Sequence, residues 1–221
     1  MSMPPKLALL GEYALIARAL GAPHRMLLLE QLAQGERGVE QLAEKVGVTV
    51  ANCSQHLQQL RRAGLVTNRR AGKAVIYRMT DDKTLVLMDL LGRIAQQNLS
   101  VVHGILQNLS DGIAPEPISR AELAARLEEG SVTLLDMRPE DEFAMGHIPG
   151  AEQVDLSRLD AVAATLNSSA EIIAYCRGPY CVHAHQAVAR LRQLGLNARR
   201  MEGGLPEWRA AGLPVQATVS V

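Results

Sequence analysis

Apolar residues recur every three to four positions through most of residues 1–110, and this period predicts helices. The expected helices cover residues 6–20, 24–33, 39–46 and 50–63. Thr49 is placed to cap the fourth helix, because its hydroxyl can accept a hydrogen bond from the first turn, and Gly64 is placed to end it.

A hairpin and one long helix are expected to complete this half of the chain. The strands are expected at 65–68 and 74–79, with the basic segment 69–73 as the tip between them. Thr80 then caps a helix to about residue 109, roughly 40 Å long at 1.5 Å per residue. Its apolar residues form two stripes, so one face can pack on its own domain while the other forms a dimer. The alternative is the core helix of a single larger domain.

Strands and helices alternate in the second half, after a break in the helical pattern. Residues 110–117 hold one glycine and two prolines, which is typical of a linker. We expect strands at 132–136, 171–175 and 198–201, and helices at 120–129, 161–166, 182–194 and 205–211. This order predicts a parallel sheet with ligands at the carboxyl ends of its strands. The expected organisation is a mainly α domain at 1–110, a linker at 111–116 and an α/β domain at 117–221.

Composition is that of a globular protein of the reducing cytoplasm. Of the 221 residues, 48% are apolar, and no stretch has the roughly 18 apolar residues of a membrane helix. The first residues lack a signal-peptide pattern, and three cysteines are too few for a disulfide framework. Aromatic residues make up only 3%, which argues against stacking platforms for single-stranded nucleic acid. We therefore expect a cytoplasmic protein that does not contact membranes.

A net charge of zero hides opposite charges in the two halves. Residues 1–110 carry 13 Lys and Arg against 8 Asp and Glu, whereas residues 111–221 carry 10 against 15. Between Leu60 and Thr80 the chain has only basic charged residues and no acid at all, so we expect nothing nearby to neutralise them. A surface that faces phosphate is the functional interpretation, and a solvated face is the alternative.

The helix expected at 50–63 has one apolar side and one polar side. Cys53, Leu57 and Leu60 fall together at helical spacing, and we expect them in the core. The opposite side carries small, amide and basic side chains, which suit base edges and phosphates in the major groove of double-stranded DNA. Basic residues of the hairpin can reach the DNA backbone or the minor groove. The candidate DNA-binding residues are Ala51, Asn52, Ser54, Gln55, Gln58, Gln59, Arg62, Arg69, Arg70 and Lys73.

The order helix, turn, helix, basic hairpin is that of a winged helix-turn-helix. Residues 52–66 resemble the recognition helix and first wing strand of the ArsR/SmtB family. The resemblance covers about residues 8–100 and implies a homodimeric bacterial repressor, with the first and last helices at the interface. Many members release DNA on binding metal, yet residues 38–42 lack the family's cysteine pair, and the last helix offers only Asp89 and His103 besides its early acids. With Cys53 as its single cysteine, this half is expected to hold no metal and no sensor.

Cys176 begins a short loop between the strand expected at 171–175 and the following helix. Such a loop points backbone N–H groups at its own centre, and the start of a helix adds positive potential. Arg177 adds a cation, and these features lower the pKa of a thiol. The sequence therefore predicts a nucleophilic cysteine, with an ordinary half-buried cysteine as the alternative. The rest of the loop is Gly178, Pro179, Tyr180 and Cys181.

Motifs on both sides of this loop resemble the two signatures of rhodanese sulfurtransferases. They lie at 134–138, 142–143 and 146–151, and at 203–208 with 212–215. The match covers about residues 117–215 and implies a rhodanese-like α/β domain with a parallel sheet. It implies that Cys176 takes sulfur from a donor such as thiosulfate, holds it as a persulfide and passes it to a thiol acceptor. Asp136 and Arg138 resemble a buried pair that braces the loop, and no cofactor is expected.

Two departures bear on the chemistry of the loop. Phosphatase relatives of this fold place an arginine six positions after the cysteine, where this chain has Val182, so the loop has the size of a sulfurtransferase loop. Cys181 stands where rhodaneses often carry Arg or Lys, and it either exchanges sulfur with Cys176 or only weakens the attraction for anionic donors. A zinc cluster with His183 and His185 is an alternative that the loop geometry disfavours.

The interpretation that joins both halves is a DNA-binding regulator, expected to be a repressor, whose rhodanese domain couples sulfur chemistry to operator binding. Its partners are operator DNA, a second copy of the chain, a sulfane-sulfur donor and a thiol acceptor. One alternative is a sulfurtransferase that uses its helical half only to dimerise. Another is a repressor whose rhodanese domain is an inert scaffold. Assays of DNA binding and of sulfur transfer from thiosulfate to cyanide separate the three.

Overall fold

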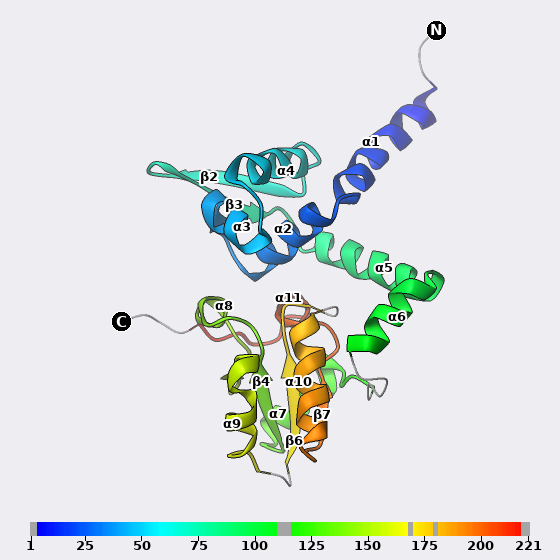
Figure 1. Cartoon of the computed structure of the whole chain (residues 1–221). Coiled ribbons are helices and arrows are strands. Elements are labelled where there is room, and N and C mark those ends of the chain that lie inside the picture. Colours follow the sequence, from blue (N-terminus) through cyan, green and yellow to red (C-terminus); the bar gives the residue numbers. More distant parts are fainter. Residues whose placement is uncertain (1–3, 110–115, 168–169, 179–180, 218–221) are drawn as a thin grey trace. The chain divides into compact units, whose positions relative to one another are not determined.

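The computed structural model describes residues 4–109, 116–167, 170–178 and 181–217. The chain forms two compact units, residues 1–88 and 89–221, and each is described by itself (Figure 1). The first is mainly helical and the second contains a parallel sheet, so the expected fold class is confirmed. Except for Glu116, the expected linker at 111–116 lies outside the described residues. Within those residues, no helix combines the length and apolar character needed to span a membrane.

Four helices, the first residues of a fifth and a small antiparallel sheet make up the first unit. Leu28 and Leu29, Leu42 of the next helix, and Cys53 and Leu57 are fully buried and pack in one core, as the helical period predicts. The three strands are ordered β1-β3-β2. The elements are α1 (Pro5–Leu20), α2 (Pro23–Gln34), β1 (Arg37–Gly38), α3 (Val39–Val46), α4 (Val50–Arg62), β2 (Val66–Ala71) and β3 (Ala74–Met79).

Helix α4 begins and ends close to the predicted positions. The Thr49 hydroxyl accepts a hydrogen bond from the backbone N–H of Asn52 at 3.2 Å, which satisfies one of the unpaired donors at the start of the helix. Gly64 follows the helix with a φ of 72°, a conformation that glycine adopts without a steric penalty. The backbone N–H of Leu65 then donates to the carbonyl oxygen of Leu60 at 3.0 Å, which closes the helix end.

The hairpin tip is shorter than predicted. Strand β2 continues through Arg69 and Arg70 to Ala71, which pairs with Ala74 at the start of β3. The two arginines therefore lie in the strand rather than in the tip. Arginine keeps its charged head in water while its backbone pairs, so a basic composition does not interrupt a strand. Strand β1 was not predicted, because two residues are too few to show a period.

The single long helix expected after the hairpin is in fact two helices. Helix α5 (Lys83–Asn98) and helix α6 (Ser100–Leu109) are separated at Leu99. The side-chain amide of Asn98 donates to the carbonyl oxygen of Ile94 at 2.8 Å. That oxygen is the acceptor for the backbone N–H of Asn98 in a regular helix, and such competition weakens the helix locally. The apolar period is continuous across this break and therefore did not reveal it.

The predicted cap of this helix was also wrong. Helix α5 begins at Lys83 rather than directly after Thr80. The carboxylate of Asp81 accepts a hydrogen bond from the backbone N–H of Lys83 at 2.7 Å. This bond lowers the pKa of Asp81, because it stabilises the ionised carboxylate. An aspartate therefore takes the capping role expected of the threonine, as aspartate and threonine both can.

The second unit is a four-stranded parallel sheet with helices on both faces (Figure 1). The strands are ordered β5-β4-β6-β7. Along β6, Ile172 and Ala174 pack with α9 and α10, whereas Ile173 and Tyr175 pack with α7 and α11. The elements are α7 (Arg120–Glu128), β4 (Val132–Asp136), α8 (Glu140–Met145), β5 (Glu152–Gln153), the 3-10 helix Leu156–Arg158, α9 (Leu159–Ala163), β6 (Glu171–Tyr175), α10 (Val182–Gln193), β7 (Ala198–Arg200) and α11 (Leu205–Ala210).

Four elements of this unit differ from the sequence prediction. Helix α8, strand β5 and the 3-10 helix were not predicted, because their six, two and three residues are too short to show a period. Helix α9 covers Leu159–Ala163 instead of 161–166. The carboxyl ends of β4 and β6 meet as expected, since Asp136 is in register with Tyr175. The residues that follow these two strand ends therefore lie at one edge of the sheet.

Candidate functional site

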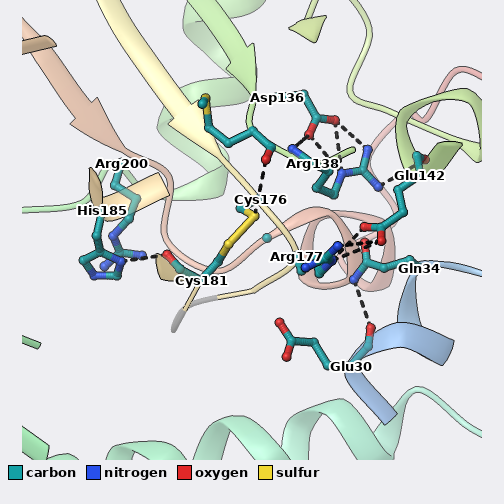
Figure 2. Close-up of a disulfide and its surroundings, with 12 residues drawn as sticks. Glu30, Gln34, Asp136, Arg138, Glu142, Cys176, Arg177, Cys181, His185 and Arg200 are labelled. Atoms are coloured by element: carbon teal, nitrogen blue, oxygen red, sulfur yellow. Dashed lines mark hydrogen bonds and ion pairs between the residues drawn. A yellow bond between two sulfur atoms is a disulfide. The ribbon is translucent and has the colours of Figure 1, made fainter. Parts of the chain in front are cut away.

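Cys176 follows β6 at the carboxyl edge of the sheet, in the position that the sequence predicts for a nucleophile. Its side chain is buried, and its Sγ lies 4.0 Å from the carbonyl oxygen of Met137. A disulfide joins Cys176 to Cys181, whose Cα atoms are 6.1 Å apart (Figure 2). The predicted loop residues Pro179 and Tyr180 lie outside the described residues.

Arg177 is paired with a buried acid of helix α8. Its guanidinium donates to both carboxylate oxygens of Glu142, at 2.8 to 3.1 Å, and Glu142 is fully buried (Figure 2). The positive charge predicted beside Cys176 is therefore matched by a carboxylate. Glu142 was not among the candidate residues, although it lies in one of the flanking motifs. The pairing ties the cysteine loop to α8 and offsets the cation beside Cys176.

Gly204 supports the loop from the segment before α11. A Cβ atom built on Gly204 would lie 2.5 Å from the carbonyl oxygen of Cys176 and from the carbonyl carbon of Arg177, and still closer to the backbone nitrogen of Gly178. The backbone N–H of Leu205 also donates to the carbonyl oxygen of Cys176 at 3.2 Å. Only glycine fits at this position. Sequence reasoning did not assign Gly204 to the site, and its one signal was the glycine pair at 203–204.

Asp136 and Arg138 form the buried pair that the resemblance implied. Both side chains are fully buried, and Arg138 Nη2 lies 2.5 Å from Asp136 Oδ2. Burial lowers the pKa of Arg138, but the Asp136 carboxylate outweighs it, so the pKa is raised and the charge is retained. Arg138 also donates to the carbonyl oxygen of Gly146 at 2.7 Å and stands over the ring of Tyr175, the residue before Cys176. The pair therefore fixes the strand end that carries the loop.

Two histidines of α10 lie beside the disulfide in different ways. His185 is buried, and its Nδ1 is 2.9 Å from the carbonyl oxygen of Cys181. Burial lowers its pKa, and the nearby charge of Arg200 acts in the same direction, so the ring is neutral near pH 7. His183 is exposed, and its ring nitrogen and the two sulfurs lie within 4.8 Å of one another. Among the described residues, this is the one such group that could hold a metal ion.

The outward side of α4 carries the predicted recognition residues. Ala51, Asn52, Gln55, Gln58, Gln59 and Arg62 are exposed, whereas Ser54 is half-buried. The apolar side is in the core, since Cys53, Leu57 and Leu60 are fully buried. Arg25 of α2, which sequence reasoning missed, donates to the side-chain oxygen of Gln59 at 2.5 Å. This bond holds the Gln59 amide in place on an otherwise open face.

The hairpin keeps fewer unneutralised cations than predicted. Arg69 forms an ion pair with Glu36 at 2.8 Å, and Arg78 lies 4.0 Å from the same carboxylate. The expectation that no acid neutralises this basic cluster is wrong for Arg69, because it forms an ion pair with Glu36, which lies outside residues 60–80. Arg70 and Lys73 are exposed near the end of the hairpin. These two residues and Arg62 are the candidates for contacts with phosphate.

Cys53 has the properties of a core residue. It is fully buried, and burial raises the pKa of its thiol to about 11. At neutral pH the thiol therefore stays protonated and is a poor nucleophile. Chemistry that needs a thiolate is thus left to the second unit.

Family models match the two halves of the chain in this order. Residues 22–68 match the bacterial regulatory protein arsR family, and residues 119–211 match the rhodanese-like domain. Among solved structures, a homodimeric winged helix-turn-helix DNA-binding domain from Mycobacterium bovis is 35% identical, with a TM-score of 0.41, covering 45% of this chain and 92% of its own. A rhodanese-related protein from Thermoplasma volcanium is 28% identical, with a TM-score of 0.42, covering 46% and 98%.

One curated relative matches along almost the whole chain. The HTH-type transcriptional regulator Rv0324 of Mycobacterium tuberculosis is 40% identical over 210 residues, which are 95% of this chain and 92% of the relative. The similarity thus runs through both halves of this chain and covers nearly all of a relative of similar length. The chain therefore belongs to the arsR family of bacterial regulatory proteins, as a transcriptional regulator that carries a rhodanese domain in its second half.

Proposed function

We propose that the protein is a homodimeric repressor that binds operator DNA through α4 and the hairpin, and whose rhodanese domain carries sulfane sulfur on Cys176. The observation that carries the DNA-binding role is the two-sided character of α4. Its apolar residues fill the core, while its other side exposes three glutamines, an asparagine and an arginine. Amide and guanidinium groups read base edges and contact phosphates in the major groove.

Exposed apolar side chains support the dimer. On α1 they are Leu7, Leu9, Leu10, Tyr13 and Leu15, and on α5 they are Val86, Leu87, Leu90, Leu91 and Ile94. Apolar surface of this extent marks an interaction site. A second copy of the chain is its expected occupant, because paired recognition helices read two half-sites about 34–36 Å apart.

DNA binding is expected to weaken steeply as salt rises. Arg62, Arg70 and Lys73 give about six phosphate contacts per dimer, and each contributes about −0.9 to the slope of log K against log salt concentration. The expected slope is about −5, measured by fluorescence anisotropy with the reduced full-length chain and duplex DNA.

Two variants test this slope. Arg70→Ala is expected to make it about 2 less steep, because one contact is lost from each protomer. Arg158→Ala removes an exposed arginine of the second unit and is expected to leave the slope unchanged. A flat salt response in the wild type, or equal slopes in the two variants, contradicts binding through this face.

The sulfur chemistry is assigned to the reduced form of the loop. The Cys176 thiolate attacks the outer sulfur of thiosulfate, the S–S bond of the donor breaks, and sulfite leaves with the electron pair. Cys176 then carries a persulfide, whose negative charge is stabilised by the loop amides and by the start of α10. Attack of an acceptor thiolate on the outer sulfur restores the Cys176 thiolate.

Cys181 provides a second reaction that consumes the persulfide. A separation of 6.1 Å between Cα atoms is within the usual range for a disulfide, about 4.4–6.8 Å. The Cys181 thiolate attacks Cys176 Sγ, the persulfide S–S bond breaks, and hydrosulfide leaves. The sulfane sulfur is thereby reduced and the thiol pair oxidised, which gives the disulfide of Figure 2.

Cys181→Ser is accordingly expected to lengthen the life of the Cys176 persulfide, on the order of tenfold or more, because the internal attack is lost. Mass spectrometry of the reduced protein, sampled after a short treatment with polysulfide, measures this lifetime. The wild type is expected to accumulate a Cys176–Cys181 disulfide or trisulfide. Equal lifetimes with no cross-link in the wild type would leave Cys181 without this role.

A further inference from the structure

The two loop cysteines have a third potential ligand beside them. The sulfurs of Cys176 and Cys181 and a ring nitrogen of His183 all lie within 4.8 Å of one another. His183 is exposed in the first turn of α10, two residues after Cys181, so its ring can turn without displacing packed side chains. Both cysteines are buried, whereas the histidine borders solvent. Three soft or borderline donors thus converge from the loop and the start of one helix.

The structure also separates the roles of the two neighbouring histidines. His185 is buried, with its Nδ1 held at the carbonyl oxygen of Cys181, so it fixes the backbone of that cysteine. Its contact is with a backbone oxygen rather than with a sulfur. His183 and not His185 therefore completes the ligand set.

We propose that, once the disulfide is reduced, Cys176, Cys181 and His183 bind a Zn²⁺ ion and leave a fourth position to water. Zn–S bonds of about 2.3 Å and Zn–N bonds of about 2.0–2.1 Å place tetrahedral ligand atoms about 3.5–3.8 Å apart. The described group needs a contraction of about 1 Å at its widest. The bond between the sulfurs must open, and Cα atoms 6.1 Å apart accommodate both arrangements. Two cysteines and one histidine with an open position are a known zinc ligand set.

The two cysteines supply the negative charge that a divalent ion needs. Two thiols bind Zn²⁺ as thiolates and release two protons, so the two thiolates balance the charge of the ion, and the neutral histidine adds none. Arg177, the nearest cation in the sequence, is paired with the buried Glu142.

Bound zinc would exclude the other two states of the loop. Zinc needs both cysteines as thiolates, whereas a Cys176 that carries a persulfide or is joined to Cys181 in the disulfide is no longer a free thiolate. Zinc therefore binds only when both cysteines are reduced. The proposed zinc site does not depend on whether the loop transfers sulfur.

Zinc titration of the full-length chain tests the site. The protein is reduced with a phosphine, kept anaerobic and titrated with Zn²⁺ against a chromophoric chelator. We expect one Zn²⁺ per chain that is lost on oxidation to the disulfide. His183→Ala is expected to lower the affinity at least about tenfold, because one of three protein ligands is removed. His103→Ala, which removes an exposed histidine of α6, is the matched control and is expected to bind as the wild type does.

Cobalt gives a second readout. Co²⁺ bound to the wild type is expected to show the thiolate charge-transfer absorption, and the double variant Cys176→Ser and Cys181→Ser is expected to lose it together with the zinc. Circular dichroism verifies that each variant is folded. The site is overturned if the reduced wild type takes up no zinc at one equivalent. It is equally overturned if His183→Ala binds as tightly as His103→Ala, or if the double variant keeps its zinc.

Discussion

Cys176→Ser is expected to lower sulfur transfer from thiosulfate to cyanide by on the order of 10³-fold or more, because no other thiolate stands at the centre of the loop. Cys53 is buried with its pKa raised to about 11, and Cys181, whose sulfur can join that of Cys176, precedes α10 and is assigned the later attack on the persulfide rather than the attack on the donor. In the assay, cyanide attacks the outer sulfur of the persulfide, leaves as thiocyanate and restores the Cys176 thiolate. The protein must first be freed of its disulfide, and the reductant removed before thiosulfate is added.

DNA binding by Cys176→Ser serves as the control for this loss of sulfur transfer. A serine at Cys176 changes one atom in the second unit, so the DNA affinity of the reduced protein and its salt slope are expected to match the wild type. Thermal unfolding verifies that the fold is kept. Turnover retained by Cys176→Ser contradicts the assignment and moves the nucleophile to Cys181.

Gly204→Ala is expected to lower sulfur transfer strongly, although the substitution changes no sulfur atom. The added methyl group would lie 2.5 Å from the carbonyl oxygen of Cys176, closer than real contacts allow, and it meets backbone rather than flexible side chains. The loop or the start of α11 must therefore shift. Overpacking of this kind costs about 1–3 kcal/mol of stability. We expect turnover to fall about 100-fold or more, as displacement of a reacting group by about 1 Å does.

The matched control for this substitution is Gly104→Ala in helix α6. A Cβ atom at Gly104 meets nothing within 4 Å, and alanine favours a helix over glycine by about 1 kcal/mol. This variant is expected to keep full turnover and to be as stable as the wild type or more so. Full activity in Gly204→Ala shows that the contact with the loop does not position Cys176.

The recognition helix could be predicted from sequence because its signals are local. Cys53, Leu57 and Leu60 repeat at the helical period, Thr49 and Gly64 mark its ends, and all five behave in the structure as expected. The parallel sheet was predictable for a similar reason. Runs of apolar residues at 132–136 and 171–175 are strands buried on both faces, as their continuous hydrophobicity indicates.

The apolar period and the local charge count gave no prediction where a single side chain or a distant segment determines the structure. At the break at Leu99 the Asn98 side chain competes for a backbone carbonyl oxygen, and the apolar period runs through the break. Glu36 offsets Arg69 from 33 residues away, so a count of charge within one segment overestimated the basic surface. Period and local charge carry no information about such contacts.

The cysteine loop shows the same limit. Its own residues and the buried pair at Asp136 and Arg138 were identified, because they belong to contiguous motifs. The supports from Glu142 and Gly204 were not identified, although both lie in the flanking motifs, because the ion pair of Glu142 with Arg177 and the close approach of Gly204 to the loop appear only in the folded chain. His183 was considered only together with His185, and their different contacts appear only in the folded chain.

The central claim is that sulfur chemistry at Cys176 changes operator binding. The direct measurement uses fluorescence anisotropy with a duplex that the reduced protein selects from a random-sequence pool. The Kd is measured at one salt concentration before and after treatment with a stoichiometric sulfane-sulfur donor, with the state of Cys176 read by mass spectrometry. We predict that the treated wild type binds at least about tenfold more weakly, a coupling of about 1.4 kcal/mol, and that Cys176→Ser does not respond. An unchanged Kd in wild-type protein whose Cys176 is fully modified contradicts the account.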